Sequence, residues 1–388
     1  MGLFRGLLCA VFAAAFCNPA NADSTIDYSF GGGWTGNVFK DPSALSSPFT
    51  EGKLSLRGSL ALENSEFAYG LNASARRLAR YRFADERRAG AEFGFDRDLG
   101  EAVKLTLRGG IEHRQEGDLF LALPGLLIGY RKAEVAAAAS AGITVEHAGG
   151  KSRLVAALSS LQRAKARFTL PALPHTRLEA DNRLLDLTGG HIRPLFGGEA
   201  GITLQYRANR IPAGQQHPLD RFPAETLRGS LAYGRAFGDG ITLMAEAGIV
   251  RVGSPELGVS VDRTRPFLKA ELAIPLPRDT VFKAKFGRDI QLADIDDPLG
   301  EDVRTAGLSL ETALTERLKL ALAYEHARSD WLYYDYRTRT TATTATLTYT
   351  LAKGAAAALE YSRLVRRETD KAAGFRVDGL AMRFSGSF

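Results

Sequence analysis

Cysteine is almost absent from this sequence. Its two cysteines, Cys9 and Cys17, lie in a leader that starts with a basic residue, continues as an apolar run and ends in the small-residue pattern A-N-A at residues 20–22. This order is typical of a secretory signal peptide, so we expect residues 1–22 to be removed. A lipidated Cys17 is the alternative, but Phe16 stands where a lipoprotein signal has a small residue.

The predicted mature chain, residues 23–388, has no cysteine although secretion places it in an oxidising compartment. A disulfide framework, a cysteine nucleophile and a cysteine metal site are therefore excluded. The mature chain also lacks a run of about eighteen apolar residues, which excludes a membrane helix. A formal net charge of +6 is small for 388 residues and does not indicate a nucleic-acid partner.

Catalytic motifs are missing as well. The sequence has no G-x-S-x-G, no H-E-x-x-H and no P-loop, and its 6 histidines are dispersed without the spacing of metal ligands. We therefore predict neither an enzyme nor a bound cofactor.

Alternation with a period of two residues is abundant. In residues 54–62, leucine and glycine alternate with serine, arginine and alanine, and residues 69–76, 89–96 and 103–112 repeat the pattern. The alternation resumes at residues 202–207 and continues to the end of the chain. Runs of about ten such residues match a tilted membrane strand, of which one face meets lipid and the other water. The sequence therefore predicts an all-β protein.

The connections between these runs alternate between short and long. Short turns are predicted near residues 64–66, 97–101, 148–151, 238–240, 277–279, 315–317 and 352–354. Longer polar stretches are predicted at residues 37–52, 79–88, 115–132, 163–182, 210–225, 253–264, 288–302, 328–338 and 366–374. This spacing predicts about eighteen strands, with both termini on the side of the short turns.

Three segments leave the strand count open. Residues 133–147 and 153–163 fit a helix almost as well as a strand, and residues 182–199 are poorly patterned. If one hairpin here is a helix or a plug, about sixteen strands remain, and fourteen is the next alternative.

Together these features resemble the outer-membrane β-barrels of Gram-negative bacteria as a class. The resemblance rests on the leader, the alternating strands, the asymmetric connections, the lack of cysteine and a final strand that ends on Phe388. It implies a closed antiparallel transmembrane barrel over residues 23–388, with short periplasmic turns, long external loops and periplasmic termini. A soluble β-sandwich or β-solenoid is the alternative fold.

The closing strand carries two expectations. We expect it to pair with the first strand, near Ile26–Trp34, because an open sheet edge would leave unpaired amides in lipid. In barrels of this class the last strand resembles the signal that the barrel-assembly machinery recognises. That resemblance assigns the signal to Leu380, Met382, Phe384 and Phe388.

The polar face of the strands carries many charges of both signs, which a dry core does not hold. They imply a wide, water-filled lumen, in which charges either pair along the wall or form a constriction that admits polar solutes. The candidate lumen-lining residues are Arg57, Glu92, Lys104, Arg108, Glu112, Arg207, Arg228, Glu246, Lys269, Glu271, Lys283, Lys285, Glu311, Lys319 and Arg383.

Such a lumen favours a channel for the passive diffusion of small polar solutes. One alternative is an export pore for an acidic polysaccharide. Another is a non-conducting surface barrel whose loops bind lipopolysaccharide or another ligand. In each case outer-membrane lipid is the surrounding partner.

Two segments of the predicted external side are candidate sites. Arginines at one hairpin tip suit phosphate, which predicts lipopolysaccharide contact through Arg76, Arg77, Arg80, Arg82, Arg87 and Arg88. Acidic residues in the stretch 288–302 offer a weak calcium site, although their spacing is not that of an EF-hand loop. Its candidate ligands are Asp294, Asp296 and Asp297.

Overall fold

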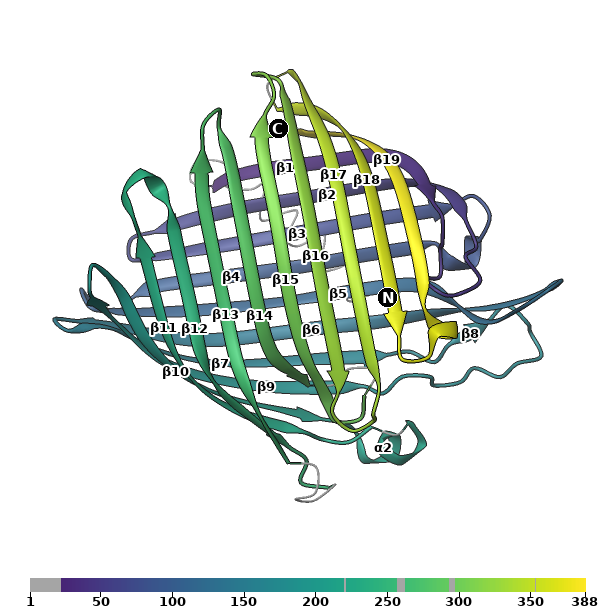
Figure 1. Cartoon of the computed structure of the whole chain (residues 1–388), viewed down its shortest axis with the longest axis horizontal. Coiled ribbons are helices and arrows are strands. Elements are labelled where there is room, and N and C mark those ends of the chain that lie inside the picture. The colour runs from purple at the N-terminus through teal and green to yellow at the C-terminus, as the bar shows by residue number, and fades with distance from the viewer. Residues whose placement is uncertain (1–21, 220, 257–261, 293–296, 353) are drawn as a thin grey trace.

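Long strands, each hydrogen-bonded to the next, form a closed wall (Figure 1). The computed structural model describes residues 22–219, 221–256, 262–292, 297–352 and 354–388. Apart from Ala22, the predicted signal peptide therefore lies outside the described residues. The wall strands are β1 (Ala22–Thr35), β2 (Ser47–Leu62), β3 (Ser65–Leu78), β4 (Glu86–Asp98), β5 (Val103–Leu123), β6 (Leu126–His147), β7 (Gly150–Arg163), β9 (Asn182–Leu195), β10 (Gly198–Arg210), β11 (Glu225–Ala236), β12 (Thr242–Gly253), β13 (Arg263–Leu276), β14 (Thr280–Leu292), β15 (Gly300–Ala313), β16 (Leu318–Trp331), β17 (Arg337–Ala352), β18 (Ala355–Glu368) and β19 (Phe375–Ser387).

Short elements occupy the connections. They are the two-residue strand β8 (Arg167–Phe168), helix α2 (Ala213–Leu219) and the 3-10 turns η1 (Arg82–Ala84), η2 (Gly238–Gly240) and η4 (Lys371–Ala373). Among the described residues, no helix has the length and apolar character needed to cross a membrane.

Each wall strand runs antiparallel to its neighbours, and β1 pairs with β19, so the sheet has no free edge around the barrel. Strands of opposite walls cross at a steep angle in the view of Figure 1, as expected of tilted strands in a barrel. The predicted closed antiparallel barrel of 18 strands is therefore confirmed.

Connections are short at one end of the barrel and, apart from the β5–β6 turn, longer at the other. The short-turn end has connections such as residues 63–64 and 148–149, and both termini of the wall lie there. The long-loop end has connections such as residues 164–181 and 211–224. The predicted asymmetry is confirmed.

One predicted loop is wrong. Residues 115–132 are the tips of β5 and β6, which stay paired up to Leu123 and Leu126 and turn at Gly125 with φ +79°. Polar residues still alternate in this hairpin. Lys132, for example, lies 3.6 Å from Glu116 of the opposite strand. A polar composition suggested a loop where the strand alternation in fact continues.

The three ambiguous segments are strands. Residues 133–147 belong to β6, residues 153–163 to β7 and residues 182–195 to β9. Partners on both sides supply hydrogen bonds to these strands, which outweighs the weak strand preference of alanine. No hairpin is lost to a helix, so the higher strand count holds.

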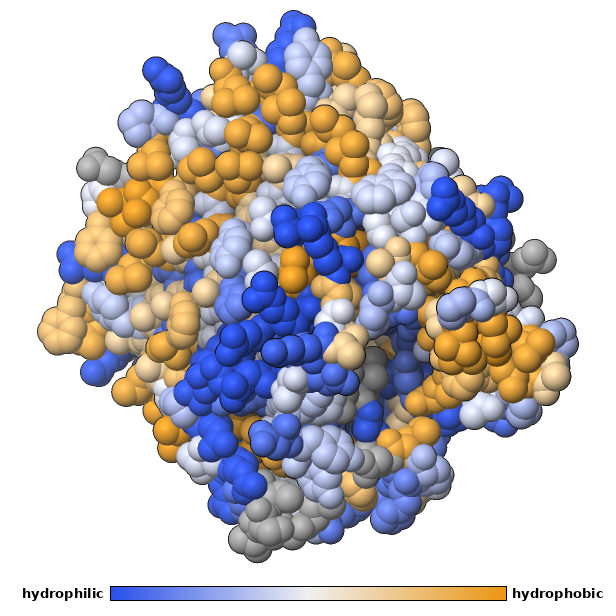
Figure 2. Space-filling model, turned by 45° about the vertical axis from the view of Figure 1, so that its right-hand side comes forward, coloured by the Kyte–Doolittle hydropathy of each residue, from blue (hydrophilic) through white to orange (hydrophobic). Residues whose placement is uncertain are grey.

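The alternation separates an apolar outer face from a polar inner face. Leu227 and Leu231 of β11 and Ile249 of β12 are 58%, 69% and 64% exposed. Figure 2 shows hydrophobic side chains over much of the visible surface beside a continuous hydrophilic patch. An apolar surface of this extent is unfavourable in water and favourable against acyl chains.

The seam between the first and last strands closes as predicted. Residues 27–35 of β1 pair with residues 379–387 of β19. The Ile26 N–H donates to the Phe388 carbonyl at 2.8 Å, and the Phe388 N–H donates to the Ile26 carbonyl at 3.1 Å. The chain end is therefore part of the wall rather than a frayed tail.

Gly31 gives the seam an unusual close approach. It lies on the inner face of β1, directly between Arg383 of β19 and Glu51 of β2. Because Gly31 has no side chain, Arg383 reaches across β1 and places Nε 2.5 Å from a Glu51 oxygen. A Cβ at Gly31 would overlap the Met382 carbonyl oxygen and lie 3.1 Å from Arg383 Cγ.

Gly31→Val is therefore expected to obstruct closure of the barrel. The added side chain overpacks the seam, which typically costs about 1–3 kcal/mol. The fraction of folded barrel, measured as heat-modifiable protein on gels of outer-membrane extracts, should fall. Gly52→Val is the matched control, because a Cβ there meets nothing nearer than 3.9 Å. Equal folded yields for the two variants would contradict the role of Gly31.

Candidate functional site

Contacts between distant strands identify the barrel interior. Arg207 of β10 places Nη2 3.3 Å from Asp289 of β14, and Arg228 of β11 reaches the same carboxylate at 3.5 Å. Since β12 and β13 separate β11 from β14 in the wall, these side chains meet across the interior. The face that carries them is the inner face.

The wall opens between β13 and β14 at the long-loop end. Pairing of the two strands stops at Leu268 and Arg288. β13 nevertheless pairs with β12 back to Arg263, and β14 pairs with β15 on to Leu292. Residues 289–292, here called the inward tip, bend into the interior.

An apolar cluster holds the inward tip in place. Ile290 of the tip is fully buried against inner-face residues of β12 and β13. The Arg207 guanidinium also donates to the Ile290 carbonyl at 2.7 Å. The cluster comprises Ala224, Val250, Val252, Phe267, Ile290 and Leu299.

The inward tip extends towards the opposite wall. Leu292 lines a hollow of about 480 Å³ together with Asn72 of β3, Glu112 of β5 and Asn182 of β9. The interior is therefore narrowed at this level of the barrel.

A second apolar cluster narrows the long-loop end from the other side. Phe39, in the connection between β1 and β2, covers the inner-face residues Phe49, Leu78 and Ala381. The Phe39 ring stacks on Phe83 with centroids 5.7 Å apart. Two connections thus pack into the mouth of the barrel rather than away from it.

Hydrogen bonds to a loop carboxylate fix a further connection. Burial would raise the pKa of Asp181, but the Arg163 N–H at 2.7 Å, the Gln215 amide at 3.0 Å and the charge of Arg177 together lower it. Asp181 therefore stays ionised and ties the β7–β9 connection to helix α2, in which Gln215 lies.

Register places all fifteen predicted lumen residues on the inner face. Eight of them have polar partners and seven have none among the described residues. Their role along a solute path stays a prediction. The partnered ones are Lys104 and Arg108 with Asp96, Arg207 and Arg228 with Asp289, Lys269 with Glu271, Glu246 with Ser230, and Arg383 with Glu51 and Glu360. The others are Arg57, Glu92, Glu112, Lys283, Lys285, Glu311 and Lys319.

Alternating charges span the seam on the inner face. Arg383 binds Glu360 of β18 at 2.6 Å and Glu51 of β2 at 2.5 Å. Glu51 also binds Arg76 of β3 at 3.0 Å, and Arg76 lies 3.8 Å from Glu86 of β4. This seam network links strands on both sides of the closing pair.

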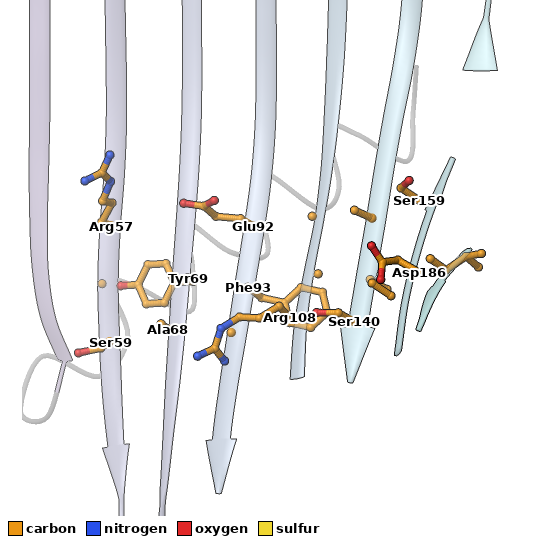
Figure 3. Close-up of a pocket in the computed structure, with 18 of the residues that line it drawn as sticks. Arg57, Ser59, Ala68, Tyr69, Glu92, Phe93, Arg108, Ser140, Ser159 and Asp186 are labelled. Atoms are coloured by element: carbon orange, nitrogen blue, oxygen red, sulfur yellow. The ribbon is translucent and has the colours of Figure 1, made fainter. Parts of the chain in front are cut away.

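A wide hollow lies on the inner wall from β1 to β9. Its volume is about 890 Å³, and Figure 3 shows Arg57, Glu92, Arg108 and Asp186, which belong to β2, β4, β5 and β9, around it. Asp186 accepts a hydrogen bond from Gln205 at 2.8 Å, whereas Arg57 and Glu92 have no partner within the described part of the chain. Such a surface suits water and polar solutes.

Three lysines form the cationic part of the opposite wall. Lys283 and Lys285 of β14 and Lys319 of β16 are exposed, and none has an ion-pair partner among the residues described. Their ammonium groups are therefore available to a solute in the lumen.

Two partners in these networks escaped the sequence prediction. Glu51 and Asp289 fall inside the stretches 37–52 and 288–302 that were assigned to loops. The two-residue alternation could have identified them, because Glu51 occupies an inner-face position of β2 and Asp289 an inner-face position of β14.

The six predicted lipopolysaccharide contacts do not share one surface. The ion pair with Glu51 holds one of them, Arg76, in the interior. Register divides the set between the inner face (Arg76 and Arg88), the outer face (Arg77 and Arg87) and the β3–β4 connection (Arg80 and Arg82).

The remaining predicted sites are partly described. Asp297 is buried, and its two oxygens accept four backbone N–H groups, from residues 299, 300, 333 and 334. Asp294 and Asp296 lie outside the described residues. The apolar residues of the closing strand, which the sequence assigns to an assembly signal, lie on the outer face, and that role stays a prediction.

Comparisons with known proteins place the fold. No protein-family model matches the chain, and no curated protein matches it. The siderophore receptor PirA of Acinetobacter baumannii is similar over 95% of this chain and 80% of its own length, with a TM-score of 0.55 and 6% identity. The copper transporter OprC is similar over 95% and 80%, with a TM-score of 0.54 and 10% identity. Identities this low show the fold alone, and the predicted class-level resemblance to outer-membrane β-barrels is confirmed.

Arg383→Ala is expected to destabilise the barrel because it leaves the Glu51 and Glu360 carboxylates without their bridge. Loss of charge-assisted hydrogen bonds at a half-buried site costs about 2 kcal/mol. Urea unfolding in detergent micelles measures this change. Arg376→Ala, which removes an exposed ion pair of the same strand, should leave stability close to that of the wild type. Equal effects of the two substitutions would contradict the importance of the seam network.

Proposed function

We propose that the protein is a water-filled channel of the outer membrane, with the long-loop end external, through which small polar solutes diffuse passively. The observation that carries the proposal is the inner face, where charged side chains of both signs line wide hollows and several have no partner within the described segments. Removing such charges from water is costly, so a wet lumen accounts for them better than a dry one.

The barrel interior supports this proposal further. Throughout the described part of the chain, every element is a wall strand or belongs to a connection between strands. Solutes would pass between these walls and meet the inward tip near the external side. The tip is fixed by Asp289 and Ile290, so we propose it as the size-limiting constriction.

The charges on the two walls suggest which ions the proposed channel would favour. Lys283, Lys285 and Lys319 lie on β14 and β16, whereas Glu92 and Glu112 lie on β4 and β5, half a circumference away. Glutamates also lie on the lysine wall, Glu271 and Glu311 among them, and Arg57 and Arg108 lie on the other, so charges of both signs would order water and polar solutes across the lumen. The exposed lysines favour anions weakly.

An export pore for an acidic polysaccharide is the second candidate. The same three lysines favour it, because exposed ammonium groups along one wall would attract the carboxylates of a polymer. Replacing Lys283, Lys285 and Lys319 together by Gln should then reduce polysaccharide secretion by cells that carry the gene. Unchanged secretion would remove this candidate.

Conductance of the purified protein in planar lipid bilayers tests the channel directly. We expect stable open conductance with weak anion preference, and Lys283→Gln should lower the anion-to-cation permeability ratio by about twofold. Lys371→Gln, in the connection between β18 and β19, is the matched control and should leave the ratio unchanged. A barrel that never conducts would contradict the proposal and favour a surface-binding protein.

Asp289→Ala tests the inward tip. The substitution frees Arg207 and Arg228 from their shared carboxylate, so the tip loses its polar anchor and we expect a larger single-channel conductance. Asp262→Ala removes a carboxylate whose ion pair is with the exposed Arg251, and it should leave conductance unchanged. A conductance of Asp289→Ala equal to that of the wild type would show that the tip does not limit passage.

A further inference from the structure

Arginines gather beside the split between β13 and β14. Arg288, Arg304 and Arg328 are direct cross-strand neighbours on β14, β15 and β16. Arg265 of β13 and Arg337 of β17 flank them, and all five line one hollow of about 530 Å³. Like charges in adjacent register repel, so this row of guanidinium groups needs negative partners.

Three aspartates line the hollow, and two of them, Asp302 and Asp330, bind its arginines. Asp302, which is 3% exposed, accepts hydrogen bonds from Arg288 at 3.0 Å and 2.6 Å. Asp330 binds Arg328 at 3.0 Å and Arg337 at 2.5 Å. Three carboxylates among five guanidinium groups leave a cationic excess around the hollow.

One hydrogen-bond donor in the hollow is not satisfied. Arg304 stands 3.7 Å from each of Asp302 and Asp330, and its buried Nε has no hydrogen-bond partner among the described residues. Buried donors are normally paired, so the Arg304 Nε indicates a ligand that presents acceptor oxygens.

The hollow borders the apolar outer face. On the outer face of β14, Arg288 lies one position closer to the long-loop end than Phe286, which is 44% exposed. On β15, Arg304 lies in the same way beyond Ala306 and Leu308. An acyl chain on the apolar face would therefore continue directly into a headgroup at the arginines. This order of apolar and cationic surface matches an amphiphile rather than a soluble anion.

We propose that this hollow binds a phosphate group of a phosphorylated glycolipid of the outer leaflet, with Arg304 as the central contact. Guanidinium groups pair with phosphate through two parallel hydrogen bonds, and Arg304 offers a free N–H group to its oxygens. Register places Arg288, Arg304 and Arg328 on the lipid side of the wall, and the site is distinct from the arginines of the β3–β4 hairpin. It depends on the barrel lying in the outer membrane with its long-loop end outward, but not on conduction.

Native mass spectrometry of the purified barrel in detergent tests the assignment with bisphosphorylated lipid A as the probe. We expect the wild-type protein to retain the lipid, and Arg304→Gln to weaken retention about tenfold, the loss of one good charge-assisted contact. The same lipid with its phosphates removed should be retained as poorly by the wild type as lipid A is by Arg304→Gln. Heat-modifiable migration of each variant checks that the barrel has folded.

Arg183→Gln is the matched control. Arg183 lies on the outer face of β9 at the long-loop end, next to the exposed Leu185, and has no charged or hydrogen-bonding partner within the described ranges. This variant should retain lipid A like the wild type. Equal weakening by Arg183→Gln and Arg304→Gln, or equal retention of the dephosphorylated lipid, would overturn the site. Saturation by inorganic pyrophosphate with no preference for the lipid would overturn the glycolipid assignment.

Discussion

The backbone pairing of β1 with β19 is the interaction on which the rest of the structure depends. In a bilayer the amides of an edge strand have no solvent partner, so a sheet of this size is stable only when its first and last strands meet. The geometry of the seam follows from this requirement. Gly31 lets Arg383 cross the closing strand, and the chain end at Phe388 is held by the backbone of Ile26.

Closure of the barrel also determines how the charged side chains of the inner face are satisfied. Once the wall is continuous, its polar side chains face one another across a shared space and satisfy their charges from water or from opposite charges. Near the seam they pair, as the alternation of Arg383, Glu51 and Arg76 shows. Lys283 and Lys285 of β14 and Lys319 of β16, in contrast, have no partners among the residues described. Paired charges connect neighbouring strands, whereas the exposed lysines are the groups that the proposed channel would present to solutes.

The fold was largely predictable because alternation is a property of each strand by itself. The strand count, the asymmetry of the connections and the closing pair all follow from phase and spacing. The inward tip was not predictable, because it arises where β14 leaves β13 while still pairing with β15, a choice made by tertiary contacts of Ile290 and Asp289. The arginines of the hollow are unpredictable for the same reason: polar composition favours loops over residues 288–302 and 328–338, although Arg288, Arg304 and Arg328 lie in register on paired strands.

The separation of β13 from β14 links the two sides of the wall. The end of β14 bends inward, so Ile290, which has the outer-face position in the strand alternation, packs against the inner surface of β12 and β13. This packing forms the proposed constriction. Beside the same bend, Arg265 of β13 comes within 3.6 Å of Asp302 on β15. A lipid held in the proposed site would therefore contact the elements that position the inward tip. The proposed lipid site and the proposed constriction thus share strand β14.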